Sequence, residues 1–430
     1  MKPSLLLAAA LLWALPCFGA PKKPTPTPAP SIFKPKPTPT PKPDAKPEAK
    51  PLSGPAPELK LLKAECSSPL YIRAEAGVNQ LANVTLTATA TPTRPGTPVE
   101  VVFNPSLGDN GTAVLKAVKA ILTEIHQRWP AGHRVEILCN PPVAQDDAGA
   151  AALATAILLD SLIGGWEADP SCSIVGGLQA SGKIQGATAA VMRLTTASRG
   201  NSSRIIMPEK NATQASDCLV NVGPANAGRI QMFAVRTFED IMLMAAAKLE
   251  DNMTKSIAFF QEAQKQIEPA GDKADQLLKD DSDLRETLRS ALENCPNHMT
   301  ARLLLGRTTG RYLHFSLHSS LNTIAQVTPT VQQGILSPRP MDVTKLPAAK
   351  LKQELEILQG AQSRMDPRAS KYLGAVLRYA TAASGWYTHP PTTNAEVAKV
   401  TAELANAAGD ARDQRTDLAT VLTTELSTTQ

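Results

Sequence analysis

The stretch DDAGAAALATAILLDSLIG, residues 146–164, decides the fold class of this chain. From Ala148 to Ile163 it is rich in Ala and Leu, which have high helix propensity. Asp146 and Asp147 precede this run, and an aspartate readily accepts hydrogen bonds from the free amides of a first helical turn. We therefore expect a long helix here, and the neighbouring segments decide what kind of domain contains it.

Strands and helices alternate on both sides of this helix. β-Branched residues predict strands at residues 84–90, 99–103, 135–139, 173–178, 204–208 and 219–222. Two more helices are predicted at residues 112–129 and 187–198, the first from apolar residues at helical spacing. Such alternation predicts a single α/β domain over residues 58–248.

The chain after residue 248 shows only helical patterns. Apolar residues form three stripes at helical spacing, namely Leu284, Leu288 and Leu292, then Leu351, Leu355 and Leu358, then Val397, Val400 and Leu404. Asp366 and Thr393 stand where cap residues begin a helix. Residues 291–306 resemble the junction of a helical hairpin. We predict an all-α domain over residues 249–430, of helical-hairpin or tetratricopeptide-like type, although no repeat of fixed period is visible.

The first nineteen residues have the three parts of a signal peptide. Lys2 supplies the positive charge, Leu5–Leu15 the apolar core, and Gly19 a small residue before the cleavage point. No other segment is apolar for long enough to anchor the chain, so we expect no transmembrane anchor. Residues 1–19 therefore predict an exported protein that is periplasmic, in the cell envelope or extracellular.

Residues 20–57 contain 14 of the 36 prolines and seven lysines, against only Asp44 and Glu48. This composition favours an extended polyproline II chain over a packed core, so we expect a disordered linker. It serves as a spacer or as a basic strap on an acidic envelope polymer. The whole chain has a net charge of +5, of which this linker carries +5 and Lys2 a further +1, which leaves −1 for residues 58–430. A nearly neutral body argues against nucleic-acid binding.

Five cysteines stay in the chain after the expected cleavage, namely Cys66, Cys139, Cys172, Cys218 and Cys295. An exported protein meets an oxidising compartment, so disulfides are allowed, and the odd number leaves at least one thiol over. Cys139 and Cys172 are one candidate pair because both lie at predicted strand ends. No cysteine spacing matches a zinc site, and GLQASGKI (177–184) resembles a phosphate loop but lacks the hydroxyl that binds Mg²⁺. We expect no metal and no cofactor.

Four sequence blocks occur in an order known from one protease family. They are NPSLGDN (104–110), DDAGAA with the helix after it (146–164), GLQASGKI (177–184) and RIIMPEKN (204–211). In order and spacing they resemble the proteolytic domain of Lon proteases, where the second block reads DGPSAG. The resemblance covers residues 66–248. It implies an α/β (α+β) domain of the Lon proteolytic type.

The resemblance also implies a catalytic pair, from which this chain departs. Lon-type hydrolysis uses a serine nucleophile and a lysine base, and these positions correspond to Gly149 and Arg193 here. Glycine has no hydroxyl, and arginine keeps its proton at usable pH, so neither residue can take the role. Asp146 or Asp147 matches the family's acidic position before the serine, with capping of the helix as the simpler role. We expect Gly149 at a helix start, with Arg193 on the next helix facing it.

These observations lead to three hypotheses. The first is an inactive pseudo-protease that binds peptides or proteins, or acts as a scaffold, in the cell envelope, because adding a peptide strand to a sheet edge needs no catalytic group. The second is an active serine-type endopeptidase with a displaced pair, Ser181 or Ser161 with Lys183. The third is a purely structural envelope protein. The resemblance further implies a homo-oligomer, since Lon domains form hexamers.

Overall fold

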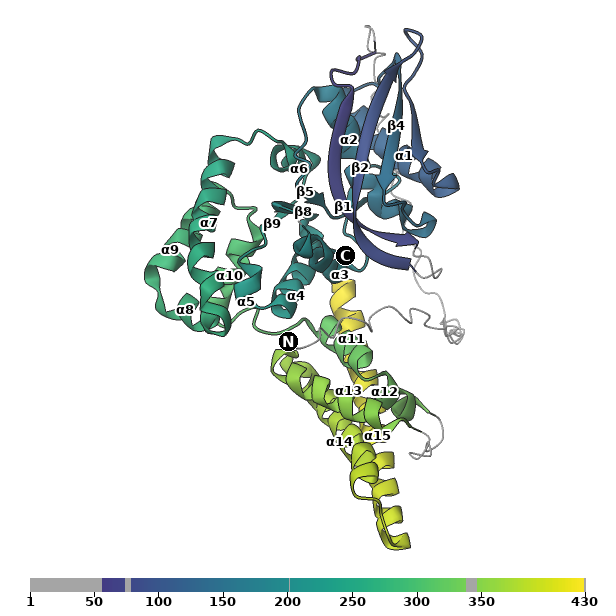
Figure 1. The fold of residues 1–430 in the computed structure, drawn as a ribbon, viewed down its shortest axis with the longest axis vertical. Coiled ribbons are helices and arrows are strands. Elements are labelled where there is room, and N and C mark those ends of the chain that lie inside the picture. The colour runs from purple at the N-terminus through teal and green to yellow at the C-terminus, as the bar shows by residue number, and fades with distance from the viewer. Residues whose placement is uncertain (1–55, 74–78, 201, 338–345, 429–430) are drawn as a thin grey trace, which may run out of the picture.

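The computed structural model describes residues 56–73, 79–200, 202–337 and 346–428. It consists of a mixed α/β part with a seven-stranded sheet, followed by helices (Figure 1). The mixed α/β class and the helical C-terminal region predicted from the sequence are therefore confirmed. The predicted signal peptide and residues 20–55 of the predicted linker lie outside the described residues.

Seven strands form the central sheet in the order β3-β4-β2-β1-β5-β8-β9. Their bounds are Lys63–Arg73 (β1), Asn79–Pro92 (β2), Glu100–Asn104 (β3), His133–Asn140 (β4), Cys172–Ile174 (β5), Arg204–Pro208 (β8) and Met232–Val235 (β9). β2 runs antiparallel to β1 and β4, and the other neighbouring pairs are parallel. A small separate sheet joins β6 (Gly177–Leu178) and β7 (Ile184–Gln185). The antiparallel strand β2 thus lies inside a sheet that is otherwise parallel.

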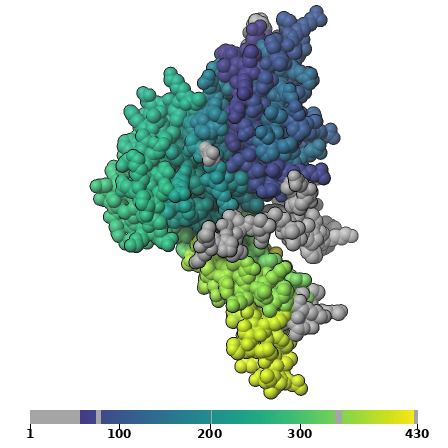
Figure 2. All heavy atoms as spheres, viewed as in Figure 1, coloured from purple at the N-terminus to yellow at the C-terminus, as the bar shows by residue number. Residues whose placement is uncertain are grey.

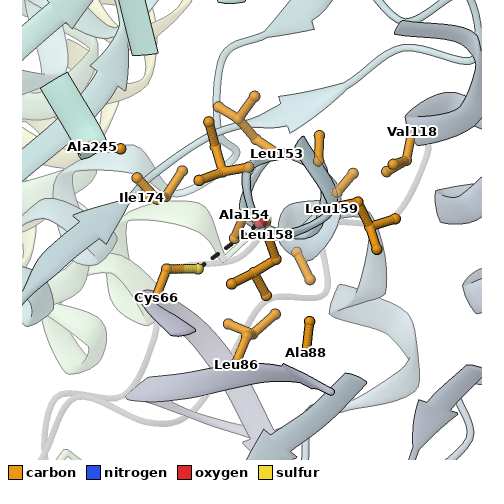
Figure 3. Close-up of a cluster of buried hydrophobic side chains, with 14 of the residues drawn as sticks. Cys66, Leu86, Ala88, Val118, Leu153, Ala154, Leu158, Leu159, Ile174 and Ala245 are labelled. Atoms are coloured by element: carbon orange, nitrogen blue, oxygen red, sulfur yellow. Dashed lines mark hydrogen bonds between the residues drawn. The ribbon is translucent and has the colours of Figure 1, made fainter. Parts of the chain in front are cut away.

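The stretch that decides the fold class forms η1 (Gln145–Ala151) and α2 (Ala152–Gly164). All but the last residue of α2 is buried, as expected for a helix that is apolar on all sides. Figure 3 shows its side chains packed against Cys66 and Leu86 of the sheet. Gln145–Gly164 is long and apolar enough to cross a membrane, but 78% of its most apolar window is buried inside the fold. A core helix has the same properties.

The other helices of the α/β part are α1 (Gly108–His126), α3 (Ala190–Arg199), α4 (Ala212–Val222), α5 (Pro224–Ala227) and α6 (Phe238–Ala245). The prediction of a strand at residues 219–222 is wrong, because these residues form the last turn of α4. A short β-branched run has no periodicity of its own, and Leu219 and Val220 are buried on a helix face instead. The strand predicted at residues 173–178 is divided into β5 and β6, and β1 and β9 have no predicted counterpart.

Four helices continue the α/β core beyond the boundary predicted at residue 248, namely α7 (Asp251–Ala270), α8 (Ala274–Asp280), α9 (Ser282–Asn294) and α10 (Met299–Thr308). Phe260 and Leu288 of these helices lie in one buried cluster with Met207 of β8 and Met232 of β9. The predicted hairpin junction is the turn between α9 and α10. These four helices therefore share their core with the sheet.

The last five helices form a second core, and they are α11 (Leu317–Val327), α12 (Pro329–Leu336), α13 (Ala348–Ala361), α14 (Ser370–Thr388) and α15 (Asn394–Thr428). Figures 1 and 2 show them as a narrow extension that projects away from the sheet. The predicted cap of α15 is present, because Thr393 N donates to Glu396 Oε2 at 3.1 Å and Glu396 N donates to Thr393 Oγ1 at 3.2 Å. Asp366 caps the short helical turn before α14.

Asp217 of α4 joins this C-terminal extension to the α/β part. Its carboxylate is 1% exposed and accepts hydrogen bonds from Ser316 N at 2.6 Å, Ser316 Oγ at 2.8 Å and Ser319 Oγ at 2.6 Å. The two serines stand at the start of α11, so a buried negative charge meets the free amides and hydroxyls of a helix N-terminus. This contact fixes the direction in which the extension leaves the body.

His298 joins the α9–α10 turn to strand β9. Its ring lies between Phe233 and Phe260, with centroid separations of 4.6 Å and 4.4 Å, and its Nδ1 accepts from Ala301 N at 3.3 Å. The other ring nitrogen, Nε2, has no hydrogen-bond partner among the described residues. Burial therefore disfavours the charged ring and lowers the pKa of His298 to about 3.

Replacing Asp217 with Asn should loosen the C-terminal extension. An amide has one acceptor oxygen instead of two and turns an NH₂ donor toward the serine donors. We therefore expect the free energy that holds the extension against the α/β part to fall by about 1–3 kcal/mol. Limited proteolysis should then cut near residues 309–316 faster than in the wild type. The exposed Asp272, changed to Asn, is the matched control. Equal cleavage rates for Asp217→Asn and the wild type would contradict the role given to this carboxylate.

Acidification should destabilise the protein through His298. Between pH 6.5 and about 3 the unfolded chain binds a proton at this ring and the folded chain does not. The contribution of the neutral ring to the free energy of unfolding is therefore fully present above pH 6.5. It falls as the pH drops, by about 1.4 kcal/mol per pH unit within that window. His298→Asn keeps a capping acceptor and removes the titration, so urea unfolding of this variant should lose less stability on acidification than the wild type. The exposed His389, changed to Asn, should leave the wild-type pH dependence intact.

Candidate functional site

The candidate site lies where η1 enters α2, beside strand β1 and helix α3. The segment after β4 is fixed to β1, because Ala144 N donates to Tyr71 O at 2.8 Å. η1 follows at once and carries Asp146, Asp147 and Gly149 within this one short helix. Asp146 and Asp147, the first residues of the stretch 146–164, thus lie beside the end of β1 and the start of β2.

Asp147 does not cap α2 but binds the neighbouring elements. Its Oδ2 accepts hydrogen bonds from Tyr71 N at 2.8 Å and from Arg193 Nη1 at 3.0 Å, while its Oδ1 accepts from Arg193 Nη2 at 2.5 Å. Asp146 is exposed and accepts from Asn79 Nδ2 at 2.9 Å. The capping role predicted for these two aspartates is therefore wrong, because both carboxylates are engaged by strand residues and by α3.

Arg193 is fully occupied by protein groups. Its side chain is only 1% exposed, and besides the fork to Asp147 its Nε donates to Thr188 O at 2.9 Å and its Nη1 to Pro69 O at 2.6 Å. The guanidinium also lies over the ring of Tyr71, with Cζ at 5.2 Å from the ring centroid. A planar group with five fixed donors suits such a crowded place. Arg193 therefore ties β1, η1 and α3 together.

Gly149 lies two residues after Asp147 and faces open space. It is exposed, and a Cβ atom built on it would meet nothing within 4 Å. Its carbonyl oxygen lies against β6, since a Cβ on Gly177 would come within 3.3 Å of it. Gly149 and Asp147, the partner of Arg193, thus lie in the same short helix η1, and Gly149 brings no hydroxyl to this place.

The residues of the displaced-serine hypothesis do not form a comparable site. Ser181 and Lys183 are exposed in the β6–β7 turn, where Gln179 N donates to Lys183 O at 2.9 Å. A nucleophile and its base need a supported geometry, and both of these side chains are in solvent. Ser161 is buried in α2 and donates to Trp166 O at 2.5 Å. No hydrogen bond joins either serine to Lys183 within the described ranges.

All five cysteines of the described chain are buried and free. The predicted pairing of Cys139 with Cys172 is wrong, because β2 and β1 stand between their strands. Three strand spacings of about 4.8 Å exceed by far the Cα separation of roughly 4.4–6.8 Å that a disulfide needs. Burial raises the pKa of Cys139 to about 11 and that of Cys172 to about 12. Both thiols are therefore poor nucleophiles in the folded protein.

A separate hollow of about 660 Å³ lies between α4, α5, α8 and the segment before α14. Its wall includes Arg307, which is held by Asp275 through two bonds of 2.7 Å, together with His314 and Arg364. Neither Gly149 nor Arg193 lines it. Within the described ranges no group of three or more His, Cys, Asp or Glu side chains could hold a metal ion.

Comparison with known proteins assigns the chain to no family. No protein-family model matches the chain, and no curated protein is significantly similar to it. The site is therefore interpreted from its own residues. Sequence reasoning identified η1 and α3 but not Tyr71 and Pro69, which have no sequence signal because they meet Arg193 only through the packing of β1.

Removing one partner of the Asp147–Arg193 pair should cost a large part of the stability. Asp147→Asn leaves a buried guanidinium without its counter-charge, so we expect a loss of about 3 kcal/mol in urea unfolding. The double variant Asp147→Asn/Arg193→Met should lose less than the sum of the two single changes, since the pair is already broken in each. The exposed pair Lys265–Glu262 is the control, and Lys265→Gln should change little. Additive losses at 147 and 193 would contradict a direct coupling.

Proposed function

We propose that residues 58–248 form a Lon-type proteolytic domain that has lost its catalytic pair, and that the exported protein binds peptides or unfolded proteins in the cell envelope without cutting them. One observation carries this proposal. Arg193 stands where the sequence resemblance puts the lysine base, and it forms a bidentate ion pair with the part-buried Asp147, which matches the acidic position before the serine. The position of the nucleophile is Gly149.

The geometry of this pair is opposed to hydrolysis. A base must give up its proton, which an arginine does not do at usable pH, and the Arg193 donors described above are engaged by the oxygens of Thr188, Pro69 and Asp147. A nucleophile must carry an oxygen or sulfur at the open position, and a glycine offers only hydrogen. In this proposal Arg193 and Asp147 therefore have a structural role and no role in proton transfer.

Binding without cleavage remains available to such a domain. The open space in front of Gly149 is accessible to an extended chain, and main-chain hydrogen bonds to a strand need no catalytic side chain. The C-terminal extension offers a second surface on the same molecule. A purely structural role in the envelope is the competing hypothesis, and it differs in one respect, since it predicts no affinity for unfolded chains.

The wild-type protein should not cleave fluorescent casein. Gly149→Ser alone and Arg193→Lys alone should also be inactive, because losing one member of such a unit already removes most of the rate. The serine is sterically tolerated, since nothing lies within 4 Å of its Cβ. The double variant should recover a trace if the new lysine is desolvated enough to lower its pKa. Turnover of all four proteins, with a serine-reactive probe as second readout, is the measurement.

Two controls separate the three hypotheses. Cleavage by the wild type that Ser181→Ala abolishes would contradict the proposal and support the displaced pair. Binding of labelled casein, followed by fluorescence anisotropy, separates a binding module from a structural protein. A wild type that neither cleaves nor binds casein would favour the purely structural role.

A further inference from the structure

The two edge strands of the seven-stranded sheet differ in how far other residues cover them. At one edge β9 is covered by the α9–α10 turn, because Ala234 N donates to Asn297 O at 2.9 Å and Phe233 forms a bridge with His298. At the other edge β3 pairs with β4, and within the described residues no further backbone hydrogen bond involves Glu100–Asn104. The outer groups of this strand are therefore open to another strand.

The sequence of β3 does little to protect this edge. Val101 and Phe103 pack into the core, so Glu100, Val102 and Asn104 lie on the opposite face. Among the described residues this face is partly open, since Leu138, which pairs with Asn104 from β4, is 46% exposed and Val102 is half-buried. The strand has no proline, and its one charge stands at its end. An apolar, uncovered edge of this kind accepts a partner strand.

β3 is complementary to a second copy of itself. If two copies pair antiparallel about a twofold axis at Val102, Val102 faces its own equivalent and Glu100 faces the partner's Asn104. Val101 then faces the partner's Phe103. Glu100 faces the amide of the partner's Asn104, which also donates to the Glu136 of its own chain at 2.6 Å, and apolar residues meet apolar residues. A shift of the axis by one residue in either direction places Val102 opposite Glu100 or Asn104 of the partner, so the apolar side chain no longer faces its own equivalent.

We propose that this protein forms a twofold dimer through antiparallel pairing of β3, which joins the two sheets into one. The interface is isologous, so every contact occurs twice. It differs from a hexameric ring, whose contacts are head-to-tail. Because the contact is one short strand from each copy, the dimer is concentration-dependent and sensitive to a single charge at the axis.

The test uses the residue on the axis. Light scattering on wild-type protein across a dilution series should show a monomer–dimer equilibrium. Val102→Glu should raise the dimer dissociation constant by at least about tenfold, because two carboxylates then face each other and also meet Glu136 of β4. Mixing Val102→Glu with Val102→Lys should restore a heterodimer, which a merely destabilised fold would not do. Leu138→Glu, on the same face but one strand inward, is the matched control and should dimerise as the wild type does.

A second variant keeps the test decisive if Val102→Glu fails to fold. Val102→Cys should form a disulfide-linked dimer in glutathione disulfide, since antiparallel partners lie about 4.5–5.5 Å apart between Cα atoms and the natural cysteines are buried. A wild type that is monomeric at all concentrations, a hexamer that ignores Val102→Glu, or a Val102→Cys variant that does not cross-link would each overturn the proposal. So would a monomer whose casein binding is lost in Val102→Glu, because the edge would then serve a peptide.

Discussion

A guanidinium group that is buried must find its counter-charge inside the protein, and the fold around α2 is organised by this requirement. Arg193 meets it through Asp147, and the remaining donors reach main-chain oxygens of Pro69 and Thr188. Residues that are far apart in the chain are thereby fixed in one place. Charge-assisted hydrogen bonds with fork geometry are directional as well as strong, so they set orientation and not only proximity. This contact sets the orientation of the start of α2.

The apolar helix α2 and the sheet then determine the rest of the α/β part. On the side of β5, β8 and β9 the strands are buried on both faces, because helices pack on each. At β3 and β4 only one face is buried, whereas α3 also packs against β1 and the start of β2, where Asn83 Nδ2 donates to Thr196 O at 3.1 Å. Beyond Asn83, β2 alternates buried Val84, Leu86 and Ala88 with Thr85 and Thr87 on the open face. One sheet therefore has a closed half that carries the helices and an open half that ends in a bare edge.

The chemistry of the site follows from the difference between two basic residues. A buried lysine can lose its proton and act as a base, whereas an arginine stays charged and needs a permanent partner. With arginine at position 193, the neighbouring carboxylate becomes a structural counter-ion, and the open glycine at position 149 has no oxygen to activate. The same logic appears elsewhere in the molecule, where Asp217 holds the C-terminal extension through hydroxyl and amide donors. Buried charge in this protein connects parts of the fold.

The sequence by itself determined the elements whose periodicity or caps are strong. The core helix at 146–164, the strands at 84–90 and 204–208 and the cap at Thr393 follow from local residue patterns. The tertiary structure alone decided the rest. Residues 219–222 are helical because the preceding turn continues through them, and Cys139 lies three strands from Cys172 because β2 and β1 insert between their strands. Asp147 binds Arg193 instead of capping α2, since strand β1 brings Tyr71 N and Pro69 O to the same place. Contacts between residues distant in sequence depend on the order of strands in the sheet, and no local pattern encodes that order.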